Sequence, residues 1–167
     1  MSPQEAKTMS EFFLSVIDQE IPTTRRVIEA VPDDKGDYRP DENSRTALEL
    51  ARHVAVSDIW FLDAIAEGEF SQPGGEAEKK IETTSQAVAA LDELWPAALD
   101  RVRNLPGEAL AKEINMMGAF NLPAVIYLSF AIRHQVHHRG QLSVYLRPMG
   151  GKVPSIYGGS FDEPWQG

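Results

Sequence analysis

Between Asn121 and Arg147 the chain reads NLPAVIYLSFAIRHQVHHRGQLSVYLR. Apolar residues recur in this segment at spacings of three and four, which is typical of a helix. Asn121 is a suitable N-cap, and Pro123 is tolerated in a first helical turn. The first part of the segment is apolar almost all round, which predicts burial on more than one side. In a small bundle such burial favours a partner chain, so we expect a homodimer.

Three segments upstream show the same periodicity. They run from about Pro3 to Val31, from about Ser44 to Glu67, and from a start between Glu76 and Ser85 to about Leu105. Four amphipathic segments with few strand signals predict an all-α fold, a four-helix bundle. Residues 108–120 fit either a short strand pair or an irregular crossover before the last helix. The length of 167 residues suits one domain over residues 1–167.

Local signals mark the ends and interruptions of these helices. Thr46 and Glu49 have capping-box spacing at the start of the second segment, and Ser44 is the competing cap. Pro22 is expected to kink or split the first helix, because it lacks a backbone donor and crowds the preceding turn. After the last helix, residues 152–167 are expected to pack back over the bundle.

Composition limits the classes of partner. The chain is 43% hydrophobic and 25% charged, with 16 Lys and Arg against 25 Asp and Glu, a net charge of −9. An acidic chain without a basic run is poorly suited to a phosphate backbone or an anionic membrane surface. We therefore expect a small-molecule partner, and neither nucleic acid nor membrane binding.

The absence of cysteine excludes disulfides, thiolate metal sites and a cysteine nucleophile. The N-terminal sequence MSPQEAKTMSEFF lacks the features of a secretory signal. No stretch approaches about 18 consecutive apolar residues, so no membrane span is expected. These features predict a cytoplasmic protein.

The chain has four histidines, and three of them lie within five residues, at positions 134, 137 and 138. Residues four apart on a helix share a face, so His134 and His138 can bind one metal ion. His134 with His137 is the alternative pair. The row that contains Ala131 and Gln141 favours His138. His53 can also face the interior, although a lone histidine is more often an ordinary core or surface residue.

Imidazole ligands alone leave the metal open among zinc, nickel, cobalt and iron(II). Three histidines would leave at least one coordination position for water or substrate, which distinguishes catalytic sites from closed structural sites. Asp58, Tyr127, Gln141 and Tyr145 are candidates to line such a pocket. Glu49 is a candidate to orient His53, with helix capping as its alternative role.

Residues 134–142, HQVHHRGQL, together with the later GKVP at 151–154, resemble the C-terminal signature of the DinB family. Residues 46–53, TALELARH, followed by Trp60, resemble the helix 2 motif of that family. The resemblance extends over nearly the whole chain. It implies the DinB/YfiT-like four-helix bundle, usually a homodimer, with a metal bound by His53, His134 and His138.

The resemblance also implies nickel or zinc as the metal. Members of the family are described as metal-dependent hydrolases, and some relatives are transferases or isomerases that use a low-molecular-weight thiol cosubstrate. The leading hypothesis is therefore a metal-dependent enzyme acting on a small molecule, either a hydrolase or a thiol S-transferase. The alternatives are a non-catalytic metal-binding dimer that acts as a sensor, store or interaction module, and a protein whose histidines bind no metal.

Overall fold

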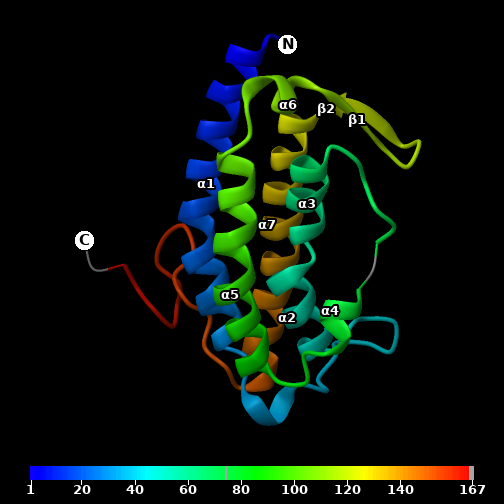
Figure 1. Ribbon diagram of the computed structural model, residues 1–167. Helices are drawn as coiled ribbons and strands as arrows, with labels where there is room; N and C mark the ends of the chain where they lie inside the picture. The colour runs from blue at the N-terminus through cyan, green and yellow to red at the C-terminus, as the bar shows by residue number, and fades with distance from the viewer. Residues whose placement is uncertain (74, 166–167) are drawn as a thin grey trace.

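The computed structural model describes residues 1–73 and 75–165 and shows a helical bundle (Figure 1). Its long helices are α1 (Pro3–Glu29), α5 (Thr84–Arg103) and α7 (Tyr127–Leu146). Two shorter helices, α2 (Ala47–Val56) and α3 (Ile59–Glu67), follow one another along the fourth side. Because α1, α2 and α3 each contact both α5 and α7, these helices enclose one core. The predicted all-α four-helix bundle is confirmed.

Short elements connect the long helices. These are η1 (Asp33–Lys35), α4 (Glu76–Lys79), α6 (Gly107–Ala111), β1 (Glu113–Met116), β2 (Phe120–Pro123), η2 (Ala124–Ile126) and η3 (Arg147–Met149). The strands β1 and β2 pair antiparallel with Ile114 opposite Leu122, and their hairpin extends from the end of the bundle where α1 begins (Figure 1). The crossover at residues 108–120 is therefore a short helix with a strand pair. Among the described helices, none has the length and apolar character needed to cross a membrane.

The predicted start of the last helix is wrong. Asn121 does not cap the last helix: it lies in β2, paired with Asn115, and α7 begins only at Tyr127. Strand pairing within the hairpin has overridden the preference of Asn for a cap. The apolar run that begins at Leu122 is consequently α-helical only from Tyr127. It therefore gives less support for a homodimer than a continuous buried helix would. The homodimer stays a prediction.

The second predicted segment is also not continuous. The chain leaves helical geometry at Ser57 and Asp58, so that α2 and α3 are separate helices. By contrast, α1 continues through Pro22 without being split. The proline therefore does not break α1. The break between α2 and α3, in contrast, falls at Ser57 and Asp58, where the sequence has neither proline nor glycine.

The start of α2 carries the predicted capping box. The Glu49 backbone N–H donates to Thr46 Oγ1 at 3.1 Å, and the Thr46 backbone N–H donates to Glu49 Oε2 at 2.7 Å. These bonds satisfy backbone donors that have no partner within the helix. Because Thr46 is the N-cap, Ser44 lies outside the helix and bonds to Asp41 instead.

Thr46→Ala is expected to lower the free energy of unfolding by about 1 kcal/mol, the usual contribution of such a cap. Urea denaturation of both proteins measures the change. Ser44→Ala is the matched control and should cost less than about 0.5 kcal/mol. An equal loss in the two variants would show that Thr46 is not the dominant cap.

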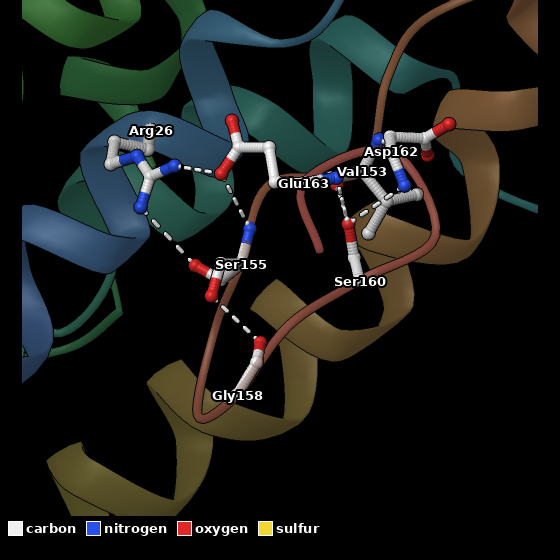
Figure 2. A network of polar contacts seen from close by, with 7 residues as sticks. All are labelled: Arg26, Val153, Ser155, Gly158, Ser160, Asp162 and Glu163. Atoms are coloured by element: carbon white, nitrogen blue, oxygen red, sulfur yellow. Dashed lines mark hydrogen bonds and ion pairs between the residues drawn. The ribbon is translucent and has the colours of Figure 1, made fainter. Parts of the chain in front are cut away.

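The described part of the C-terminal segment, residues 152–165, packs back on the bundle, as predicted. Residues 166 and 167 of that prediction lie outside the described residues. Figure 2 shows Glu163 in contact with Arg26 of α1 and accepting a 2.9 Å hydrogen bond from the Ser155 backbone. In the same network Asp162 Oδ2 accepts from the Val153 backbone N–H at 2.9 Å. These charge-assisted bonds hold the segment in one conformation against α1.

Arg139 joins the last helix to both α1 and this segment. Its side chain is 1% exposed and lies 2.6 Å from Glu20 Oε2. It also donates to Thr24 Oγ1 at 3.1 Å and to the Tyr157 hydroxyl at 2.5 Å. Because a buried guanidinium needs such partners, Arg139 fixes the rotation of α7. Its neighbour in the sequence is His138, so this contact also helps to set the position of a candidate ligand.

Candidate metal centre

His53, His134 and His138 meet where α2 packs against α7. The ring centroids lie 5.0 Å apart for His53 and His134, 4.6 Å for His53 and His138, and 4.4 Å for His134 and His138. One potential ligand atom of each residue lies within 4.8 Å of the other two, so the group could hold a metal ion. His137 is exposed and outside this group. The structure thus brings together the three histidines singled out from the sequence.

Each of the three rings has an oxygen atom beside Nδ1. The pairs are His53 with Glu78 Oε1 at 3.1 Å, His138 with Gln141 Oε1 at 3.1 Å, and His134 with Asp58 Oδ1 at 2.7 Å. An acceptor at this position favours the tautomer that carries its proton on Nδ1. The Nε2 atom then keeps its lone pair, which is the arrangement usual in histidine metal ligands.

Asp58 lies at the interruption between α2 and α3. Its side chain is 0% exposed, and neither carboxylate oxygen makes a well-aligned hydrogen bond within the described part of the chain. Asp58 Oδ1 thus lies within hydrogen-bonding distance of His134 Nδ1, but the two atoms are not aligned as in an ideal hydrogen bond. Burial raises the pKa of the Asp58 carboxyl above its usual range, although His134 and His53 oppose this effect. The site therefore contains a buried acid whose ionised form needs a nearby positive charge.

Glu78 is contributed by α4, outside the four-helix core. Burial acts to raise the pKa of the Glu78 carboxyl, but the hydrogen bond and charge of His53, with Arg45 and Arg52 nearby, lower it overall. The sequence did not identify this residue, because it lies in a charged stretch 25 positions from His53. The candidate in its place, Glu49, is engaged in the capping box and does not orient His53.

Of the remaining pocket candidates, one contacts a candidate ligand and two make packing contacts elsewhere in the fold. Gln141 contacts His138 directly. Tyr127 is fully buried and donates its hydroxyl to the Ile114 carbonyl at 2.9 Å, so it supports the hairpin. Tyr145 is buried against Tyr38, with ring centroids 5.9 Å apart. These contacts give the two tyrosines packing roles away from the histidine cluster.

His138 is expected to titrate far below a free histidine in the metal-free protein. Burial lowers its pKa to about 4, reinforced by the neighbouring histidines and partly opposed by Gln141. In the unfolded chain the same group takes up its proton near pH 6.5. Between these values the unfolded state binds more protons, so this contribution to stability is lost as the pH falls from about 6.5 to 4.

An NMR titration of the histidine ring signals measures this pKa directly, with His138→Gln identifying the resonance. The stability advantage of the wild type over His138→Gln should also shrink across the same pH window. A His138 ring that titrates near pH 6.5 would contradict the burial seen in the structure.

A cavity of about 460 Å³ opens beside the histidines. His53 and His134 form part of its wall, and α3 contributes Trp60 and Phe61. The loop after α3 contributes Ser71, whose carbonyl accepts a 2.9 Å hydrogen bond from Trp60 Nε1. A volume of this size lies within the range of small-molecule sites.

Comparison with known proteins gives a match to the family model described as DinB family over residues 4–166. The protein YjoA of Bacillus subtilis strain 168 is 32% identical over 138 residues, which cover 76% of this chain and 82% of YjoA. YrdA of the same strain is 27% identical over 157 residues, which cover 92% of this chain and 90% of YrdA. Both relatives are described as uncharacterized.

Two solved structures have a similar fold. A DinB-like protein from Bacillus cereus ATCC 10987 superposes with a TM-score of 0.75 at 20% identity, covering 88% of this chain and 97% of that protein. The crystal structure of YjoA superposes with a TM-score of 0.55 at 26% identity, covering 94% of this chain and 98% of YjoA. The first likeness is one of fold, since so low an identity carries no information about activity.

Proposed function

The chain belongs to the DinB family, and from this membership and the geometry of its histidines we propose that it is a metal-dependent enzyme acting on a small molecule. The observation that carries the proposal is the orientation of the three rings. An oxygen atom beside each Nδ1 leaves three Nε2 lone pairs for one ion. We propose His53, His134 and His138 as its ligands, with nickel or zinc as the metal.

The charges around the rings support a divalent cation. Neutral imidazoles bring no charge of their own, whereas Asp58 and Glu78 place two carboxylates directly behind His134 and His53. A divalent ion would compensate both carboxylates. Without it, the buried Asp58 carboxylate has only the partly buried rings of His134 and His53 near it, which is a costly arrangement for an ionised group.

An open coordination position favours catalysis over a structural role. Within the described residues, the cluster of potential ligands contains three histidines and no carboxylate. A closed structural site would need a fourth protein ligand. The adjoining cavity gives a small molecule access to the cluster from the side of His53 and His134.

A divalent ion at this position supplies Lewis-acid activation of a water molecule or a thiol near neutral pH. The side chains have positioning roles: the carboxylates of Asp58 and Glu78 hold the His134 and His53 rings, and Gln141 holds His138. Trp60 and Phe61 restrict water at the cavity wall and position the apolar part of a substrate. Hydrolysis and thiol transfer are both compatible with this arrangement of residues.

Activity assays of the zinc-loaded and nickel-loaded chain test the proposal. We expect turnover on an ester and amide panel or on a thiol-conjugation panel, and loss of that turnover in His134→Ala. His137→Ala is the matched control and should retain activity. Absence of turnover on both panels by fully loaded protein would favour a non-catalytic metal-binding protein instead.

A further inference from the structure

We propose that the cavity beside the histidines selects an uncharged, largely apolar small molecule and discriminates against anions. The identification of this molecule as a substrate rests on the proposed function, whereas its binding preference rests on the cavity itself. The side chains of the cavity walls other than the histidines set this preference.

The walls are mainly apolar. Val56 and Ile59 lie along the α2–α3 side, Trp60 and Phe61 supply aromatic surface, and Leu94 reaches the cavity from α5. The Trp60 ring also packs against Phe70 at 4.7 Å between centroids, and its N–H is already bonded to the Ser71 carbonyl. Because the indole N–H is occupied, Trp60 presents mainly apolar surface to a ligand.

The charged groups on the walls are acidic. Asp63 and Glu78 line the cavity, and no lysine or arginine is among the lining residues that the structure describes. Asp63 is paired with Arg101, and Glu78 contacts His53. Arg101 is thus engaged by Asp63, and the chain as a whole carries a net charge of −9. The charge of the proposed divalent ion is offset by the Asp58 and Glu78 carboxylates behind its ligands. An anionic ligand would therefore lose hydration here without gaining an uncompensated positive partner on the walls.

This preference bears on the reaction at the metal. Glutathione-like thiols carry free carboxylates, and the walls offer these groups no cation. A neutral ester, amide or aromatic compound instead matches the apolar walls and leaves its polar reacting group toward His53 and His134. The cavity therefore favours hydrolysis of a neutral substrate over use of a carboxylate-bearing thiol.

Three fluorinated probes of similar shape test the inference. They are 4-fluorophenyl methyl sulfone, which is neutral, 4-fluorobenzenesulfonate, which is anionic, and 4-fluorophenyltrimethylammonium, which is cationic. All three are poor zinc ligands, and the charge of the ion is offset by the Asp58 and Glu78 carboxylates, so differences among their affinities report the cavity walls. Fluorine NMR titration of the zinc-loaded full chain measures each Kd. We expect the sulfonate to bind on the order of tenfold more weakly than the sulfone, and the cation to bind at least as tightly as the sulfone.

Adding a positive charge at the cavity rim should increase the affinity for the anionic probe. Leu94 is 37% exposed, so Leu94→Arg places a cation at the cavity rim without disturbing the core. It should raise sulfonate affinity on the order of tenfold relative to the sulfone. Val144→Arg is the matched control: Val144 is 73% exposed on α7, outside the cavity lining, and the net charge changes equally. It should leave the ratio of affinities unchanged.

Equal or tighter binding of the sulfonate by the wild type would overturn the inference, as would an equal response of the two arginine variants. Failure of the sulfone to bind would also overturn it. The zinc content of the same samples reports separately on the proposed function. A chain without zinc that still prefers the sulfone would contradict the proposed function and support the cavity preference.

Discussion

His53→Ala and His134→Ala each abolish stoichiometric metal binding, and His137→Ala leaves it intact, if the cluster is a metal centre. Each of the first two variants removes one of three ligand atoms that lie within 4.8 Å of one another. Two imidazoles cannot replace the lost ligand, and no other potential ligand of the described chain joins the group. The His137 ring is exposed on the outer side of α7, so its removal should not affect the centre.

Elemental analysis of untagged protein, reloaded with zinc or nickel and passed through a desalting column, measures this effect. We expect about one ion per chain in the wild type and in His137→Ala, and less than about 0.1 in the other two variants. Circular dichroism checks that each variant is folded. Loss of metal in His137→Ala with retention in His138→Ala would show that the alternative pair of histidines is correct.

The second large effect is expected at Asp58. Asp58→Asn keeps the shape of the side chain and removes the charge that lies 2.7 Å from His134 Nδ1. The amide can also present an N–H to the ring, which would favour the wrong tautomer of His134. Loss of such an outer-shell partner typically weakens metal affinity by about 10–100-fold. A competition titration against a chelator measures the change.

The stability of the metal-free protein distinguishes positioning of the ligand from a general structural role. Asp58 is fully buried and its pKa is raised by that burial, so replacing the acid should leave the metal-free fold equally or more stable. The same substitution should destabilise the metal-loaded protein. A similar loss of stability in both states would contradict the positioning role.

Asp63→Asn is the matched control for Asp58→Asn. The Asp63 carboxylate lies on the cavity wall, is partly exposed and pairs with Arg101. It has no contact with a candidate ligand among the contacts described. Its replacement should change metal affinity by less than about threefold, in keeping with the small effects of surface ion pairs.

The sequence predicted the elements whose signals are local. Helical periodicity placed the bundle, and the spacing of Thr46 and Glu49 located the start of α2. The spacing of four placed His134 and His138 on one face of α7. For His53, spacing gave only a weak candidate, and the resemblance to the DinB family selected it.

Three features were not predicted: the place of Asn121 in a strand, the interruption at Asp58 and the contact of Glu78 with His53. Asn121 has the chemistry of a cap, but β1 pairs with its backbone and makes it part of a strand. The interruption at Asp58 was missed because apolar periodicity continues across it from Val54 to Leu62. Glu78 reaches His53 only through folding of the chain after α3, so no local pattern could identify it.

Anomalous diffraction from crystals of the zinc-loaded or nickel-loaded protein, recorded on both sides of the metal absorption edge, tests the three-histidine centre most directly. We expect one anomalous peak about 2.0–2.1 Å from the Nε2 atoms of His53, His134 and His138, with no fourth protein ligand. A peak bound by His137, a fourth side chain on the ion, or no peak within the cluster would contradict it.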